Sequence, residues 1–307
     1  RRPRGELSFV RRGSEHHWRV SPVGTIEPGQ VVRVGALSVA SAASAWARAV
    51  MLGWLARIAR LLLHRGSIRS PGAQWGPRWL ALLTARTLAR TSAAVGVHYD
   101  VQVSESFDPA QQYMVVWHPH GAFTYSALCY GGLLSLLRQP VRWYTGVASI
   151  LFKVPLLRQI LLLLNARRCD ASVLRALLAE GHSVGLQPGG IAEQLRTTHM
   201  QEQAFFPPNL SFLRLALEHG TPLLPVYIFG ENQLFRTTPT LQRFARRIFA
   251  LSGIPAVVPL GRWGLPWLIP RPTNVLIAFG QPVYAGPPQE PTDAAVEEVF
   301  TRYSAEL

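Results

Sequence analysis

The chain has 307 residues, of which 48% are hydrophobic, so it can bury a substantial core, and disorder throughout its length is excluded. Its 2 cysteines form no Cys-x-x-Cys pair, which argues against a disulfide framework or a structural zinc site. The formal net charge of +14 favours a polyanionic partner, such as nucleic acid, an anionic membrane surface or a phosphorylated cofactor of the coenzyme A thioester kind.

The amino-terminal third is basic and divides into two segments. Residues 1–35 are rich in Arg, Gly and Pro without hydrophobic periodicity, so we expect a disordered basic tail. Residues 36–94 combine Arg at helical spacing with Trp and Leu, which predicts a membrane-associated helical segment, with ordinary packed helix as the alternative. No window reaches the roughly 18 apolar residues of a clean span, so we expect this segment to lie on a membrane rather than cross it, with a hairpin that enters one leaflet as the alternative.

From about residue 95 the sequence alternates strand-like and helix-like runs, which predicts an α/β domain over residues 95–307. We expect strands at 95–103, 113–117, 141–146, 183–187, 222–229 and 275–279. We expect helices at 122–137, 154–165, 171–180, 210–219, 241–251 and 292–307. Three of the strands run into turns that contain Pro or Gly and deliver polar side chains.

The turn His118-Pro119-His120-Gly121 follows the apolar run 113–117 directly. Open α/β folds bind their ligands at the carboxyl ends of strands. A neutral imidazole can take a proton from an alcohol near neutral pH, so either histidine could act as a general base. We slightly favour His120, because the chain has most room beside Gly121. The alternative is that one ring only bonds a backbone carbonyl.

The other two turns each supply a carboxylate. Glu193 comes shortly after Gly189 and Gly190. Glu231 comes directly after Gly230. The whole chain has only 17 Asp and Glu residues, so two of them at strand-ending glycines carry weight. We expect these carboxylates to orient or polarise an imidazole, with a helix cap or a surface position as the alternative.

Five motifs in this order resemble the type-2 diacylglycerol acyltransferase family, which also contains monoacylglycerol acyltransferases and wax-forming enzymes. The resemblance covers residues 95 to 285, and its motifs are residues 116–121, 187–193, 212–220, 224–232, and 261–264 followed by 280–282. It implies a mixed sheet flanked by helices, like that of the glycerolipid acyltransferases, preceded by an amino-terminal membrane-associated segment.

The resemblance also implies an activity and a location. It implies transfer of an acyl group from acyl-CoA to the hydroxyl of diacylglycerol, at the cytosolic face of the endoplasmic reticulum, or at a lipid droplet or plastid. Related glycerolipid acyltransferases follow their His, after four intervening residues, with an Asp. Here those positions hold Phe123 and Tyr125, so Glu193 is the best substitute and Glu231 the second.

The expected chemistry needs acyl-CoA as co-substrate and no other cofactor. An imidazole takes the hydroxyl proton while the oxygen attacks the thioester, and backbone N–H groups of a Gly-rich turn stabilise the oxyanion. The candidates for substrate and oxyanion contacts are Pro119, Gly121, Gly189, Gly190, Arg214, Gly230, Asn232 and Arg262. Of these, Arg214 and Arg262 are candidates for coenzyme A phosphates. We expect no metal, although His118, His120 and Glu193 have the chemistry of ligands.

Several alternatives stay open at this point. The acceptor could be a monoacylglycerol, a fatty alcohol or a lysophospholipid. A basic membrane- or RNA-binding protein is the non-enzyme alternative, but we expect no nucleic-acid partner, because the aromatic and zinc signatures of such proteins are missing. The sequence leaves homo-oligomer formation, acyl-chain preference and the true amino terminus undecided.

Overall fold

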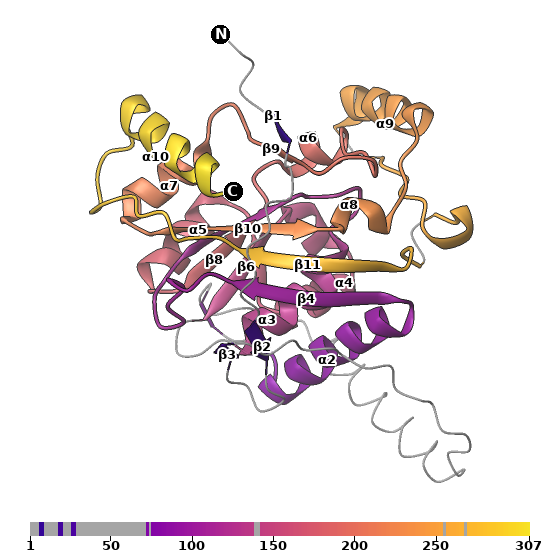
Figure 1. Ribbon diagram of the computed structural model, residues 1–307, viewed down its shortest axis with the longest axis horizontal. Coiled ribbons are helices and arrows are strands. Elements are labelled where there is room, and N and C mark those ends of the chain that lie inside the picture. The colour runs from indigo at the N-terminus through magenta and orange to yellow at the C-terminus, as the bar shows by residue number, and fades with distance from the viewer. Residues whose placement is uncertain are drawn as a thin grey trace.

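The structure is a computed structural model that describes residues 6–8, 18–20, 26–28, 72–73, 75–137, 142–253, 256–266 and 269–307 (Figure 1). A mixed sheet of 7 strands forms its centre, in the order β4-β11-β10-β5-β8-β6-β7. The strands are β4 (Val97–Val103), β5 (Met114–His118), β6 (Trp143–Val147), β7 (Ala166–Arg168), β8 (Ser183–Leu186), β10 (Leu223–Phe229) and β11 (Thr273–Phe279). β10 and β11 pair antiparallel, and the other neighbours pair parallel. The predicted mixed α/β class is confirmed.

Helices cover both faces of the sheet (Figure 1). The helices are α2 (Arg78–Ala94), α3 (Gly132–Leu137), α4 (Leu157–Leu163), α5 (Ala171–Ala179), α6 (Gly190–Gln194), α7 (Ser211–His219), α8 (Glu231–Leu234), α9 (Pro239–Ser252) and α10 (Asp293–Glu306). A π-helical stretch (Ala127–Gly131) precedes α3, and short 3₁₀ turns occupy Ser149–Lys153 and Arg262–Gly264. α5, α7 and α10 pack on one face, whereas α2, α3, α4, α8 and α9 lie on the other.

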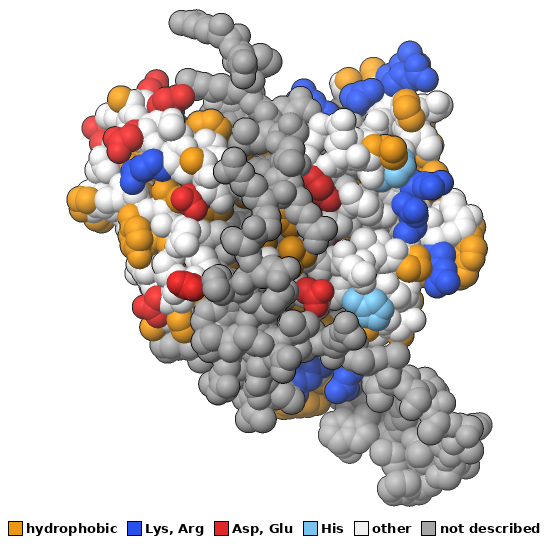
Figure 2. All heavy atoms as spheres, in the orientation of Figure 1, with side chains coloured by type: hydrophobic (Ala, Val, Ile, Leu, Met, Phe, Trp, Pro, Cys, Tyr) orange, Lys and Arg blue, Asp and Glu red, His pale blue; other side chains and the backbone are white. Residues whose placement is uncertain are grey.

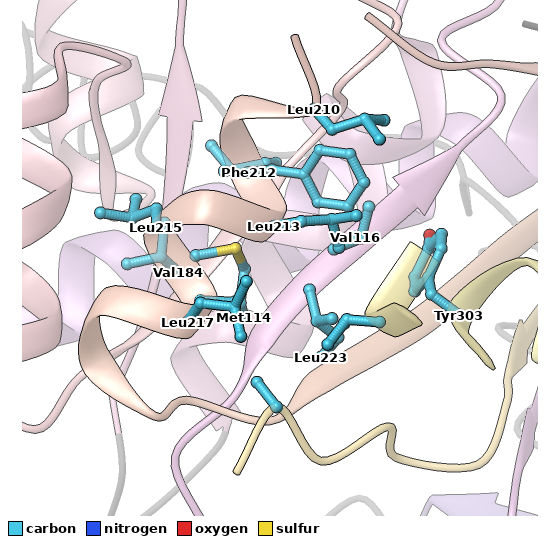
Figure 3. Packing of buried hydrophobic residues seen from close by; sticks show 14 of the residues in the cluster. Met114, Val116, Val184, Leu210, Phe212, Leu213, Leu215, Leu217, Leu223 and Tyr303 are labelled. Atoms are coloured by element: carbon cyan, nitrogen blue, oxygen red, sulfur yellow. The ribbon is translucent and has the colours of Figure 1, made fainter. Parts of the chain in front are cut away.

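Side chains of β5 alternate between these two layers, as the period of two in a strand requires. Met114 and Val116 belong to the cluster under α7 and α10, whereas Val115 and Trp117 belong to the opposite cluster. In Figure 3, Val116 lies against Leu213 of α7, with Tyr303 of α10 at the side of the same cluster. β5 is therefore buried on both faces, which explains its uninterrupted apolar sequence.

Two predicted helices differ from the structure. The helix expected from residue 122 begins at Tyr125, because residues 121–124 first complete the turn after β5. The helix expected over 154–165 is shortened to α4, and the chain then forms the short edge strand β7, which the sequence analysis did not predict.

Most of the predicted basic tail and of the predicted membrane-associated segment lies outside the described residues. In the described parts of the tail, β1 (Glu6–Ser8) pairs with β9 (Gln203–Phe205), and β2 (Trp18–Val20) pairs with β3 (Ile26–Pro28). α2 buries Leu80, Ala81 and Ala85 in a cluster shared with α3 and α4, so the packed unit includes this helix. Among the described helices, none combines the length and the apolar character that crossing a bilayer requires.

Candidate active site

Three strands in the middle of the sheet end next to one another. β5 lies between β10 and β8, and both neighbours run parallel to it. Parallel strands present their carboxyl ends at the same edge, so the turns that follow them meet there. His118 is the last residue of β5, Glu193 lies on α6 after β8, and Glu231 begins α8 after β10. The structure brings these three turns together.

Side-chain amides tie the His turn to the turn after β8. The amide of Gln187 donates to the carbonyl of Pro119 at 3.3 Å. The amide of Gln194 donates to the carbonyl of Ala122 at 2.9 Å. The peptide bond between His118 and Pro119 is cis. These two hydrogen bonds fix the position of α6 relative to the turn after β5.

His118 is fully buried, and its ring makes packing contacts but no hydrogen bond within the described residues. It packs edge-on against Phe206, with 4.9 Å between ring centroids, and lies 6.4 Å from the ring of Tyr303. Neither imidazole nitrogen has a hydrogen-bond partner among the described residues. Burial lowers the pKa of His118 to about 3, because an imidazolium is poorly solvated there. The ring is therefore neutral at physiological pH and able to accept a hydrogen bond from a ligand.

His120 has a different environment from His118. Its side chain is half-buried, and Nδ1 lies 3.3 Å from the carbonyl oxygen of Gly121 and 3.3 Å from the hydroxyl of Thr124. Burial also lowers the pKa of His120, partly offset by backbone carbonyls. The ring is thus held by groups of its own turn, which gives it a role in shaping that turn.

Glu193 is fully buried, and neither of its carboxylate oxygens has a hydrogen-bond partner among the described residues. The backbone N–H groups of His120 and Phe205 approach the carboxylate without reaching hydrogen-bond geometry. Burial raises the pKa of Glu193 to about 8, although these two N–H groups lower it in part. A Cβ at Gly189 would lie only 2.1 Å from Oε2 of Glu193, so the glycine provides the space for this carboxylate.

His118 and Glu193 border the same small region. β9 contacts both β5 and α6. Phe206, directly after β9, packs on the His118 ring, while the charge of Glu193 contributes to raising the pKa of Tyr303. The Tyr303 hydroxyl is buried and also lacks a partner among the described residues. These three groups come from the end of β5, from α6 and from α10. Because buried polar groups are almost always hydrogen-bonded, we expect a ligand to complete them.

Glu231, in contrast, has partners. It is buried, and its carboxylate accepts the backbone N–H of Tyr125 at 2.8 Å and that of Ser126 at 3.3 Å. Burial raises the pKa of Glu231 to about 7, while these N–H groups offset part of the rise. A Cβ at Gly121, where φ is +65°, would approach Cγ of Glu231 to 3.1 Å. Glu231 therefore caps the helix that follows the His turn, which was the alternative expectation for it.

We expect Glu231→Ala to destabilise the protein by about 1–3 kcal/mol, because two buried N–H groups lose their acceptor. Glu231→Gln should lose less, since its amide oxygen can still accept. Urea unfolding of the two variants and the wild type measures both differences. If Glu231→Ala kept full stability but lost kcat, the carboxylate would be an imidazole partner instead of a cap.

Glu202 is a member of the site that the sequence analysis did not single out. Its carboxylate accepts the backbone N–H of Gly230 at 3.0 Å, the Tyr227 hydroxyl at 3.2 Å and the Asn232 amide at 3.5 Å. The Asn232 amide also donates to the carbonyl of Gln201. Gly230 and Asn232 are thus engaged in holding the loop before β9 against the end of β10. The scarcity of acidic residues was the only signal that could have pointed to Glu202.

The remaining predicted residues lie in three places. Gly190 has φ of +47°, and a Cβ there would meet no atom within 4 Å, so the turn after Gly189 is open on this side. Arg214 on α7 donates to Asp293 and to the carbonyl of Pro291, so its guanidinium ties α7 to the start of α10. Arg262 lines a separate basic cavity. Among the described residues, no group of three or more His, Cys, Asp and Glu side chains is arranged to hold a metal ion.

The comparison with protein families decides the family of this chain. Residues 94–307 match the profile described as diacylglycerol acyltransferase. The chain belongs to the diacylglycerol acyltransferase family. The matched region contains all three turns, and the predicted resemblance to this family is confirmed.

The relatives of this diacylglycerol acyltransferase family chain are named for different acceptors. It is 24% identical over 215 residues to diacylglycerol O-acyltransferase 2 of Dictyostelium discoideum, covering 66% of this chain and 65% of that protein. It is 25% identical to human acyl-CoA wax alcohol acyltransferase 1, covering 65% of each chain. It is 28% identical to human 2-acylglycerol O-acyltransferase 3, covering 68% of this chain and 67% of that protein.

The chain thus spans about two thirds of the length of these relatives. Among solved structures, the 1-acyl-sn-glycerophosphate acyltransferase of Thermotoga maritima superimposes with a TM-score of 0.47 at 17% identity. That superposition covers 85% of this chain and 93% of the other.

Proposed function

We propose that this chain is an acyl-CoA-dependent O-acyltransferase that makes triacylglycerol from diacylglycerol. The observation that carries the proposal is the pair of buried, unpartnered groups, the imidazole of His118 and the carboxylate of Glu193, at adjacent strand ends of a diacylglycerol acyltransferase family chain. Acyl-CoA is the co-substrate, and the chemistry requires no further cofactor.

In the first step, His118 is the general base. A neutral imidazole with a free nitrogen takes the proton of the acceptor hydroxyl while the oxygen attacks the thioester carbonyl carbon. A carboxylate of Glu193 stabilises the imidazolium that forms. This assignment favours His118 over His120, because the nitrogens of His118 have no hydrogen-bond partner among the described residues, whereas His120 is held by Thr124 and Gly121.

In the second step, the tetrahedral intermediate collapses. The carbon–sulfur bond breaks, the new ester leaves, and the thiolate of coenzyme A takes the proton from the imidazolium of His118. The base returns to its neutral form, and no covalent acyl-enzyme is needed. The unpartnered hydroxyl of Tyr303 is a donor available to the developing oxyanion, in addition to backbone N–H groups.

The acceptor decides which ester forms. Relatives named for diacylglycerol, 2-acylglycerol and wax alcohol substrates match at similar identity, so monoacylglycerol and fatty alcohol are the alternative acceptors. A lysophospholipid acceptor would use the same base. Expression in a yeast strain that cannot make neutral lipid, followed by analysis of the lipids, tests the choice. Triacylglycerol supports the proposal, whereas wax ester alone or phospholipid alone contradicts it.

A His118→Gln/His120→Gln double variant in the same strain separates an enzyme from a binding protein. An acyltransferase loses all ester formation in this variant. A protein that only binds membranes or RNA would restore no neutral lipid even as the wild type, and its binding would be unchanged by the substitutions.

The proposed location is the cytosolic face of the endoplasmic reticulum membrane or a lipid droplet. α9 supports placement at a lipid surface, because Phe244 and Leu251 are 53% and 87% exposed beside exposed arginines such as Arg243 and Arg247. An amphipathic helix that displays large apolar side chains with basic ones is typical of an interfacial helix.

We expect Phe244→Ser/Leu251→Ser to weaken binding to phosphatidylserine-containing vesicles roughly tenfold or more, because two large apolar side chains leave the interface. Flotation with vesicles measures the bound fraction, and Tyr284→Ser is the control, because Tyr284 is 54% exposed and its backbone contacts α10. Equal flotation of the double variant and the wild type would contradict the placement of α9 at the lipid surface.

A further inference from the structure

A cavity lies beside the sheet edge that carries the candidate active site. Its volume is about 670 Å³, within the range of small-molecule sites. The segment between α8 and α9 forms one wall, and the loop that leads into β11 forms the other. The backbone pair between Arg236 and Leu260 joins the two walls. In Figure 2, Lys and Arg side chains gather on this side of the molecule, over α9 and the segment that follows it.

The charges that line the cavity are all basic. Arg236, Arg262 and Arg271 line it together with His199, and the lining contains no Asp or Glu. Arg271 donates to the backbone carbonyl of Gln233 and forms no ion pair with a described Asp or Glu. Nδ1 of His199 is buried and has no partner among the described residues. Burial lowers the pKa of His199, and the positive charges of Arg236 and Arg271 lower it further.

Other features of the cavity also suit an anion with an aromatic ring. Thr238 and Pro239, at the amino terminus of α9, line the cavity, and the dipole of this 14-residue helix presents partial positive charge there. Trp263 is 72% exposed and has φ of +58°, a conformation rare for a tryptophan. The guanidinium of Arg262 lies 4.9 Å from its ring centroid. The pair forms an exposed flat surface with a charge beside it.

A ring contact and a hydrogen bond join one wall of the cavity to the turns of the proposed catalytic site. Phe235, next to Arg236, packs edge-on against Phe123 of the His turn, with 5.9 Å between ring centroids. The hydroxyl of Thr237 donates to the carbonyl of Thr197, just after α6. This wall of the cavity therefore adjoins the turn that follows β5.

We propose that this cavity binds the phosphorylated nucleotide end of the acyl-CoA thioester, with the arginines on the phosphates and Trp263 against the adenine. Guanidinium forks match phosphate oxygens, and the exposed indole offers a face for a purine. This proposal rests on the proposed acyltransferase function, because it names the subsite for the leaving group. An anionic lipid headgroup carries the same phosphate chemistry, so the test has to separate the two sources.

The test uses an Arg236→Gln/Arg262→Gln variant of the whole chain. Arg175→Gln/Arg302→Gln removes two charges from the exposed surfaces of α5 and α10, outside the cavity and outside α9, and is the matched control. Calorimetric titration with coenzyme A and with adenosine 3′,5′-bisphosphate measures binding without turnover. We expect at least a roughly tenfold weaker affinity for both ligands in the cavity variant, and unchanged affinity in the control.

Kinetics provide a second measurement. The cavity variant should raise the KM for acyl-CoA with little change in kcat, and the wild-type preference for acyl-CoA over its 3′-dephospho analogue should shrink. If coenzyme A binding weakens as expected but the wild type transfers no acyl group, the cavity assignment holds and the proposed function fails. Unchanged coenzyme A binding overturns the assignment. Loss of binding to phosphatidylserine-containing vesicles alone also overturns it, in favour of a lipid headgroup.

Discussion

Replacement of His118 by Gln is expected to lower kcat/KM for acyl transfer by roughly 10²–10⁴-fold, the usual contribution of a general base. Gln has similar volume and polarity but cannot hold the transferred proton. The fold should persist, because the nitrogens of His118 make no hydrogen bond that Gln would break. Transfer of a labelled acyl chain from acyl-CoA to diacylglycerol measures the rate, and thermal unfolding checks the fold.

Two histidine variants serve as controls for this prediction. His98→Gln changes an exposed ring on β4 and should leave the rate unchanged. His120→Gln should lower the rate less than His118→Gln, because it removes contacts that shape the turn and leaves the base in place. A fully active His118→Gln variant together with an inactive His120→Gln variant would move the base to His120.

The second large effect concerns Glu193 and pH. Because burial raises the pKa of Glu193 from 4.5 to about 8, the folded protein binds this proton more tightly than the unfolded chain does. Unfolding therefore releases a proton between these pH values, and stability falls as pH rises from 4.5 to about 8. Above that range, the ionised buried carboxylate costs on the order of 5 kcal/mol. The tyrosines near Glu193 do not titrate in this range, since the pKa values of Tyr227 and Tyr303 are raised above their ordinary value.

The same titration of Glu193 should raise the activity with pH, whereas it lowers the stability. If the ionised form of Glu193 stabilises the imidazolium of His118, kcat/KM rises with pH and levels off above about 8. Glu193→Gln should then be more stable than the wild type above about pH 8 and equally stable near pH 5. Its rate of acyl transfer should nevertheless fall by roughly 10²-fold or more.

Thermal unfolding across this pH range tests the expected fall in stability, and rate measurements on the same samples test the expected rise in kcat/KM. Glu231→Gln is the control, because it removes the other buried carboxylate with a raised pKa but not the proposed partner of His118. A structural role for Glu193 would make Glu193→Gln less stable at every pH. That result would contradict the proposed partnership.

The pattern of elements could be predicted from the sequence because it depends on near neighbours. The apolar run before His118 predicted a buried strand, and Pro or Gly at the ends of three strands predicted the turns. The boundaries were less accurate where a local pattern continued past its element. Residues 122–124 resemble helix but belong to the turn that Gly121 begins, and the apolar stretch that contains α4 conceals the edge strand β7.

The candidate site was predictable in part. Glu193 was preferred over Glu231 as the carboxylate partner, and this order stays a prediction. In the structure the oxygens of Glu193 have no hydrogen-bond partner among the described residues, whereas those of Glu231 cap a helix. Tyr303 and Glu202 were missed. Nothing in the sequence places the last helix over the end of β5, because that contact joins residues almost two hundred positions apart and depends on which helices cover which face.

The sequence by itself determined the α/β alternation, the turns that carry His118, Glu193 and Glu231, and the family motifs, because spacing along the chain encodes all of these. Only the tertiary structure decided which polar groups are buried without partners and which are engaged. It separated Arg214, bound to Asp293, from the arginines of the basic cavity. The physical reason is that burial and convergence are set by how strands pair and which layers cover them, so they shift pKa values and leave polar atoms orphaned in ways that no local pattern records.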